Sequence, residues 1–395
     1  MNSIRRNVAL LAACQAMLLA VNSTLIAING LAGLALAPAV SLATLPVTFW
    51  VIGGAITTAP ASFYMRRVGR KRGLIRGAAA GILGVLICAG AVYLQNFWLL
   101  CAGTLVMGGS NAFGQYYRFA AADASSADFR PMAISLVLAG GLVGGILGPA
   151  ASRITVDLFA PRFMGAYLAL IAFILVAIAL LRAARLPDIP VSADAPSGRP
   201  LSVIAAQPKF IVAVLCGAIG YGVMNFLMTS TPIAMGVCGH PYGDAAFVIS
   251  SHVIGMFAPS FFTGALIRRF GTLAVMFAGA VLNLGAIAVA LSGVAVSQFW
   301  ASLVLLGIGW NFLYIGGTTL LTLTYRPEER AKAQGANEVA IFVMMAVSSF
   351  SSGLVVTSAG WDRINLFALP FIGVAMAALA WLGWHGRRRT GSLAA

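Results

Sequence analysis

Residues 62–72 read Ser-Phe-Tyr-Met-Arg-Arg-Val-Gly-Arg-Lys-Arg; they close one long apolar run, near 41–64, and precede another, near 74–94. Six basic residues fall between Arg66 and Arg76. An apolar run of about 20 residues is long enough to cross a bilayer as a helix, and short basic loops stay on the cytoplasmic side. The stretch therefore predicts a short cytoplasmic loop between two membrane-spanning helices.

The rest of the chain has the same character. Of its 395 residues, 60% are hydrophobic and only 9% are charged, whereas soluble domains are about 25% charged. Backbone groups in hydrocarbon must be paired within the protein, so long apolar runs indicate helices. The sequence predicts an all-α membrane protein whose twelve transmembrane helices lie near 8–29, 41–64, 74–94, 97–118, 131–152, 163–183, 209–231, 244–267, 272–292, 297–321, 337–358 and 365–384.

The formal charge of +15 raises the question of a nucleic-acid partner, and the positions of the basic residues argue against one. Twelve spans put both termini on one side, and 22 of the 25 Lys and Arg residues fall on that side. Only Arg153, Arg162 and Arg363 fall elsewhere. The positive-inside rule then predicts a multi-pass protein of the cell inner membrane with both termini cytoplasmic. Its surroundings are the lipid bilayer, and we expect a monomer.

A proline-rich polar interruption divides the chain into two halves. It predicts a six-helix bundle over residues 1–185, a cytoplasmic linker over 186–208 and a second six-helix bundle over 209–395. Parallel repeats of this kind are one way in which transporters are built. Three features recur in order at nearly one offset: Arg66-Arg67-Val68-Gly69 as Arg268-Arg269-Phe270-Gly271 (202), Asn111 as Asn311 (200), and Arg130 as Arg330 (200).

With these features in place, the chain resembles the major facilitator superfamily over essentially its whole length. The stretch 62–72 is similar to the family's signature between helices 2 and 3, and it keeps Arg67, Gly69, Arg70 and Lys71. It departs at Ser62, where the family has glycine, and at Arg66, where the family has an acid. The resemblance implies two pseudo-symmetric six-helix bundles and alternating-access transport. Residues 247–264 and 309–319 look similar to a proteobacterial branch that includes riboflavin-uptake members.

Polar side chains gather on four of the predicted helices, the first, fourth, seventh and tenth. Intramembrane polar residues usually face protein or a watery cavity, and the resemblance implies that these four helices line the central cavity. The alternative is that the amides only bond neighbouring helices and the aromatic rings only fill space. The predicted solute-binding residues are Asn22, Asn111, Gln115, Tyr116, Asn225, Trp310, Asn311 and Tyr314.

A gate is predicted at the cytoplasmic side. In the family, the acid of the signature is implied to face the start of helix 11, but this chain has Arg66 in that place. Glu338 lies in the first turn of helix 11, so we expect the charges to be exchanged and Glu338 to pair with Arg66 or Arg67. In the alternative, Glu338 only caps its helix. The predicted gating residues are Arg66, Arg67, Arg70, Arg268, Arg269 and Glu338.

His252 is the one histidine expected deep inside a span. A titrating histidine could couple proton movement to transport, and the alternative is a neutral buried side chain. Protons are the expected coupling ion.

The chain carries no nucleotide-binding, catalytic or metal-binding motif, so no catalytic residue, metal or cofactor is predicted. Transport must then draw on a gradient, and the sequence predicts secondary active transport of a small, planar or aromatic organic solute. Gly140, Gly144, Gly148 and Pro149 resemble an element of drug/proton antiporters. They leave two alternatives open: a proton-driven exporter of hydrophobic compounds, or a small-residue packing face. The duplicated design argues against a membrane receptor, and the lack of a catalytic pair argues against an enzyme.

Overall fold

The computed structural model describes residues 2–39, 42, 45–186 and 198–391. Within these residues every regular element is a helix. Ten helices are long and apolar enough to cross a membrane, and the bent pair α10–α11 makes an eleventh. The last of the ten is Ser358–His385, which lies within α14 (Arg330–Gly391) at and after a kink at Gly360, where φ is 80°. The prediction of an all-α membrane fold is confirmed.

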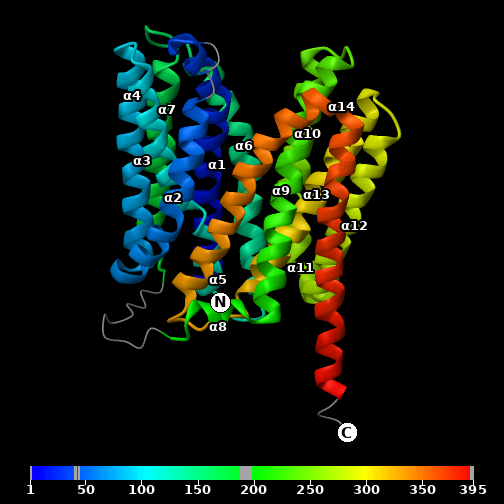
Figure 1. The fold of residues 1–395 in the computed structure, drawn as a ribbon. Coiled ribbons are helices and arrows are strands. Elements are labelled where there is room, and N and C mark those ends of the chain that lie inside the picture. Colours follow the sequence, from blue (N-terminus) through cyan, green and yellow to red (C-terminus); the bar gives the residue numbers. More distant parts are fainter. Residues whose placement is uncertain (1, 40–41, 43–44, 187–197, 392–395) are drawn as a thin grey trace. The chain divides into compact units, whose positions relative to one another are not determined.

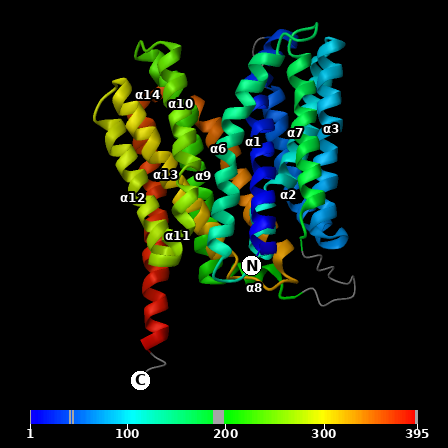
Figure 2. The ribbon, with the colours of Figure 1, turned by 180° about the vertical axis from the view of Figure 1, so that it is seen from behind.

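Contacts divide the chain into two compact units, each described here by itself (Figures 1 and 2). The first unit comprises residues 1–196 together with Gln334–Val339 from the start of α14. The second comprises the remaining residues, and the positions 187–197 of the predicted linker lie outside the described residues. The helices of the first unit are α1 (Asn2–Leu36), α2 (Leu45–Val68), α3 (Arg70–Tyr93), α4 (Phe97–Gly114), α5 (Tyr117–Asp123), α6 (Arg130–Thr155) and α7 (Met164–Ala183).

The second unit begins with a short helix and ends with the long α14. Its helix α13 packs against α9, α10 and α12. The helices are α8 (Leu201–Ala205), α9 (Pro208–Val237), α10 (Tyr242–Phe257), α11 (Ser260–Phe270), α12 (Thr272–Leu291), α13 (Val296–Leu321) and all of α14 outside Gln334–Val339.

Small residues let helix backbones meet closely inside the first unit, where α1 and α6 run side by side (Figure 2). A β-carbon at Gly140 would lie 2.0 Å from the Ala12 carbonyl oxygen, and one at Gly144 would lie 2.1 Å from that of Ala16. The Thr24 hydroxyl also donates to the carbonyl of Gly148, at 2.9 Å. The glycines of the antiporter-like element are therefore required for packing, as small residues often are between membrane helices.

The two units contain similar close contacts between a glycine of one helix and the backbone of another, as the internal sequence repeat predicts. In the first unit, a β-carbon at Gly108 would lie 1.9 Å from the Trp50 carbonyl oxygen, where α4 meets α2. In the second unit, a β-carbon at Gly307 would lie 2.7 Å from the His252 carbonyl oxygen, where α13 meets α10. Trp50 and His252 are 202 residues apart, which is the offset that the basic motifs also show. The same close helix pair is thus built twice.

One predicted helix is broken. The run near 244–267 forms two helices, α10 and α11, bent by 41°. The cause is Pro259, which has no N–H to donate and whose ring clashes with the preceding turn. The carbonyl of Met256 accepts a hydrogen bond from the Asn311 side chain of α13 at 2.7 Å, so this carbonyl is satisfied at the break.

Arg199, which lies just after residues 187–197 of the predicted linker, forms an ion pair with Glu329. Glu329, fully buried directly before α14, accepts two bonds from the Arg199 guanidinium, at 2.7 and 2.6 Å. It also accepts bonds from the backbone N–H groups of Arg199 and Arg326. These donors favour the carboxylate, and they lower the pKa of Glu329 from 4.5 to about 2.

The lowered pKa predicts an acid-sensitive contribution to stability. Because the folded pKa lies below the unfolded one, the contribution is complete above pH 4.5 and is lost as the pH falls towards 2. Glu329→Gln should lower the unfolding temperature in detergent at pH 7 by about 2–4 °C. The difference from wild type should shrink below pH 4.5. A difference that stays constant from pH 7 to pH 3 would contradict this account.

Candidate functional site

The first unit contains a cluster of three predicted solute-binding amides. Asn22 of α1 donates through Nδ2 to Oδ1 of Asn111 on α4, at 2.8 Å. Gln115, one turn after Asn111, donates to the same oxygen at 3.3 Å. The other end of the first amide, Oδ1 of Asn22, is buried and has no hydrogen-bond partner among the described residues. Spacing within α4 and packing against α1 therefore bring these amides together.

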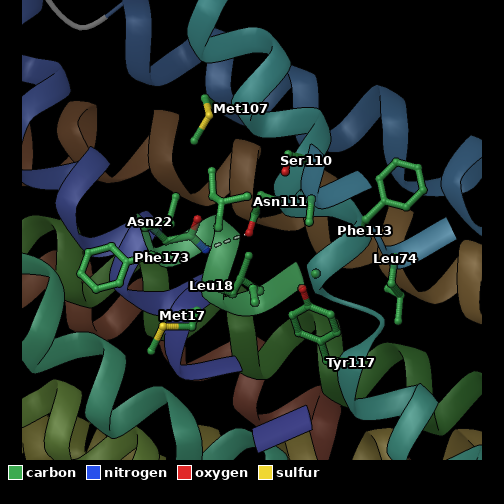
Figure 3. Close-up of a pocket in the computed structure, with 15 residues that line it drawn as sticks. Met17, Leu18, Asn22, Leu74, Met107, Ser110, Asn111, Phe113, Tyr117 and Phe173 are labelled. Carbon is green, nitrogen blue, oxygen red and sulfur yellow. Dashed lines mark hydrogen bonds between the residues drawn. The ribbon is translucent and has the colours of Figure 1, made fainter. Parts of the chain in front are cut away.

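A cavity of about 30 Å³ lies beside this cluster, inside the first unit (Figure 3). Residues of α1, α3, α4, α5 and α7 line it. Its walls are mostly apolar, and its polar groups come from Asn22, Ser110, Asn111 and Tyr117. This volume is two to three times the roughly 10–15 Å³ that one ordered water needs. The cavity can take about two small polar groups, and it is too small for a whole aromatic solute.

Tyr116 does not line this cavity. Its ring is fully buried, and its hydroxyl donates to the carbonyl of Thr58 on α2 at 2.8 Å. The guanidinium of Arg70 lies 6.0 Å from the ring centroid. Tyr116 thus ties the α4–α5 turn to α2, and its predicted solute contact stays a prediction.

Residues Gln334–Val339 of α14 belong to the first unit, and they take part in a cluster of buried charged side chains there. Arg118 forms an ion pair with Glu338, and their side chains are 2% and 1% exposed. Nearby, Arg70 bonds Asp123 at 2.6 Å and Gln334 at 3.0 Å. A buried pair of this kind is costly to break, because one partner alone leaves an uncompensated charge. Arg118 was not among the predicted gating residues, because it lies at the end of the apolar run near 97–118 and was counted with the cytoplasmic basic residues.

The prediction that Glu338 pairs with Arg66 or Arg67 is wrong. Arg67 is exposed and Arg66 half-buried at the last turn of α2, where the helix C-terminus favours cations. Arg268 and Arg269 are likewise exposed at the last turn of α11.

The second unit presents an aromatic cluster. Trp310 and Tyr314, one turn apart on α13, stack with centroids 4.9 Å apart. Tyr221 of α9 meets both rings edge-on at 5.5 Å, and Phe257 of α10 lies 5.8 Å from Trp310. Trp310 is 2% exposed, and its indole N–H has no partner among the described residues. Tyr221, only partly buried, is the ring of this cluster that a solute could reach most readily.

The two predicted amides of the second unit have protein partners. Asn311 donates to the Met256 carbonyl and, at 2.6 Å, to the Ser260 hydroxyl, and it accepts from Thr263 at 2.7 Å. It is fully buried at the α10–α11 break. Asn225 is partly buried and donates to the Ser348 hydroxyl at 2.9 Å. Asn311 therefore serves the helix break, and we leave it out of the proposed site.

His252 is fully buried in α10. Its Nδ1–H donates to the carbonyl of Leu303 on α13 at 2.6 Å. Its Nε2 has no partner among the described residues. The ion pairs of the described residues do not involve it.

Comparison with known proteins identifies the family. The sequence model described as Major Facilitator Superfamily matches residues 8–309 and 215–394. The chain belongs to the major facilitator superfamily. A riboflavin transporter of Brucella anthropi is 40% identical over 378 residues, which are 95% of each chain. An uncharacterised transporter of this type from Bacillus subtilis is 29% identical over 82% of this chain and 79% of its own length.

Solved structures of other superfamily members share the fold. The fucose:proton symporter of E. coli covers 96% of this chain and 99% of its own, with a TM-score of 0.78 and 17% identity. The human organic anion transporter MFSD10 covers 95% and 99%, with a TM-score of 0.76 and 14% identity. As a member of the superfamily, this chain is a multi-pass membrane transporter and not an enzyme.

Proposed function

We propose that this chain is a secondary active transporter that carries riboflavin, or a closely similar planar solute, into the cell by alternating access. The observation that carries the proposal is the 40% identity to a riboflavin transporter over 95% of both chains. Two features of the structure support it. The first unit offers amides beside a small cavity, and the second offers a partly open aromatic cluster on which a flat ring could stack.

The proposed solute contacts are chosen by the polar groups and ring surfaces that these side chains carry. Asn22, Asn111 and Gln115 hold polar groups at the cavity. Tyr221, Trp310 and Tyr314 supply ring surfaces, and Asn225 lies on the same helix as Tyr221, one turn further on.

Uptake of labelled riboflavin tests this function. Cells of a riboflavin auxotroph that express the protein should accumulate about tenfold more label than cells without it. Asn111→Ala should remove most of this uptake at unchanged membrane abundance. Equal accumulation in cells with and without the protein would overturn the proposal. Lower accumulation of a hydrophobic dye in the expressing cells would instead favour the exporter, for which the packing role of Gly140 and Gly144 leaves little support.

We also propose an inner-membrane location with both termini cytoplasmic, because 22 of the 25 basic residues fit that orientation. A tag after Ala395 should then be inaccessible from the periplasm. Labelling of that tag in intact cells by an impermeant reagent would contradict the orientation.

Proton coupling through His252 is the remaining part of the proposal. Its unpartnered Nε2 could take up a proton when the α10–α13 contact opens. His252→Gln keeps a similar size and can still bond the Leu303 carbonyl, but it cannot titrate. The variant should exchange riboflavin across proteoliposome membranes at a near-normal rate and fail to accumulate it against a gradient. Normal uphill accumulation that still depends on a pH gradient would exclude His252 as the coupling residue.

A further inference from the structure

The amide pair between α1 and α4 is only half closed. Two amides can form two reciprocal hydrogen bonds, but here only Asn22 Nδ2 to Asn111 Oδ1 is made. Oδ1 of Asn22 remains as a buried acceptor without a partner among the described residues, and the Asn22 side chain is 92% buried. Nδ2 of Asn111 likewise has no bond to a described residue. An acceptor and a donor are therefore left unused on neighbouring side chains.

Both groups belong to residues that line the 30 Å³ cavity (Figure 3). The Ser110 hydroxyl lines it too and has no bond to a described residue. A buried acceptor without a partner is costly, so some group with an N–H or O–H must satisfy it. The cavity has room for about two such groups, and the apolar side chains of Met107, Phe113 and Phe173 form the walls around it.

We propose that this cavity binds the edge of a ring that carries an N–H beside a C=O, as a cyclic amide or imide does. The ring N–H donates to Oδ1 of Asn22, and the adjacent carbonyl accepts from Nδ2 of Asn111. This inference rests on the proposed function and assigns the polar end of the solute to the first unit.

The second bond of Asn111 makes the arrangement directional. Oδ1 of Asn111 already accepts from both Asn22 and Gln115, so this amide presents its donor to the cavity. A ring edge with the reversed pattern, or with a methyl group on its nitrogen, would leave Oδ1 of Asn22 unpaired. Discrimination against such rings is the expected consequence, because sites built to hydrogen-bond reject analogues that lack the group.

Binding to the purified protein in detergent tests the proposal with two probes, riboflavin and 3-methylriboflavin, in which a methyl group replaces the imide hydrogen. Wild type should bind riboflavin about tenfold or more tightly than the methylated compound. In Asn22→Ala the acceptor is gone, so the ratio of the two dissociation constants should fall towards one. The ratio is measured within one preparation, so a smaller folded fraction does not alter it.

Asn283→Ala is the matched control. This buried amide lies on α12 in the second unit, outside the cavity, and its two polar atoms also lack partners among the described residues. The control should keep the wild-type ratio. Binding of neither flavin by wild type would overturn the proposed function itself. Equal binding of both flavins by wild type would overturn only the assignment of the ring edge. An unchanged ratio of dissociation constants in Asn22→Ala would show that the ring edge does not bind in this cavity.

Discussion

Replacement of Glu338 by leucine is expected to abolish transport and to lower the free energy of unfolding by about 3–5 kcal/mol. The change takes the carboxylate away from Arg118, whose guanidinium is 2% exposed. It also removes the acceptor of the Asn337 side-chain bond, at 2.7 Å. The measurement is the unfolding temperature in detergent, together with riboflavin uptake in proteoliposomes. Asp157→Leu is the control. It breaks an ion pair with Arg162 in which the side chains are 69% and 66% exposed, so it should change either value little.

The double variant Arg118→Met with Glu338→Leu separates stability from gating. Replacement of both members of a buried pair by apolar residues of similar size is often nearly neutral, so the double variant should recover most of the stability. If the ion pair of Arg118 and Glu338 also breaks and re-forms during the transport cycle, transport by the double variant should stay low. A Glu338→Leu variant as stable as the Asp157→Leu control would show that the buried pair contributes nothing.

Gly144→Val is the second change for which we expect a large effect. A β-carbon at this position would lie 2.1 Å from the Ala16 carbonyl oxygen and 2.7 Å from the Leu19 side chain, so α1 must move away from α6. Overpacking of this kind typically lowers the free energy of unfolding by about 1–3 kcal/mol. Because the neighbouring atom here is a backbone oxygen that cannot turn aside, we expect a loss of about 3 kcal/mol or more. Size-exclusion chromatography after detergent extraction should show little or no folded protein.

Gly30→Val, on α1 itself, is the matched control because nothing lies within 4 Å of its β-carbon position. It should run as a normal folded peak. Equal yields of folded protein from both variants would contradict the packing role of the α1–α6 contact.

The helices and the amides of the first unit could be predicted from the sequence because their signals are local. Long apolar runs decide the helices, and the four-residue spacing of Asn111 and Gln115 places them on one face of α4. The bond between Asn22 and Asn111 was not itself predicted, and it agrees with the alternative in which amides bond neighbouring helices. The structure contains that contact.

The partner of Glu338 and the role of Asn311 could not be predicted, because both depend on tertiary packing. Nothing in the spacing of Arg66, Arg118 and Glu338 indicates which arginine the carboxylate meets. The repeat makes Asn111 and Asn311 equivalent, but Pro259 breaks α10 from α11 and Asn311 satisfies the carbonyl at that break. A repeat in sequence therefore conserves position without conserving what the side chain does.

The residues Gln334–Val339 have a consequence for recombination between relatives. They lie in the chain between two stretches of the second unit, Ser197–Ala333 and Ala340–Ala395, yet they belong structurally to the first unit. A chimera joined at residue 196 would take Arg118 from one parent and residue 338 from the other. Exchange of whole halves therefore also exchanges one side of a buried ion pair. Functional hybrids should arise mainly when the donor of the second half also has an acid at position 338, or when the short segment travels with the first half.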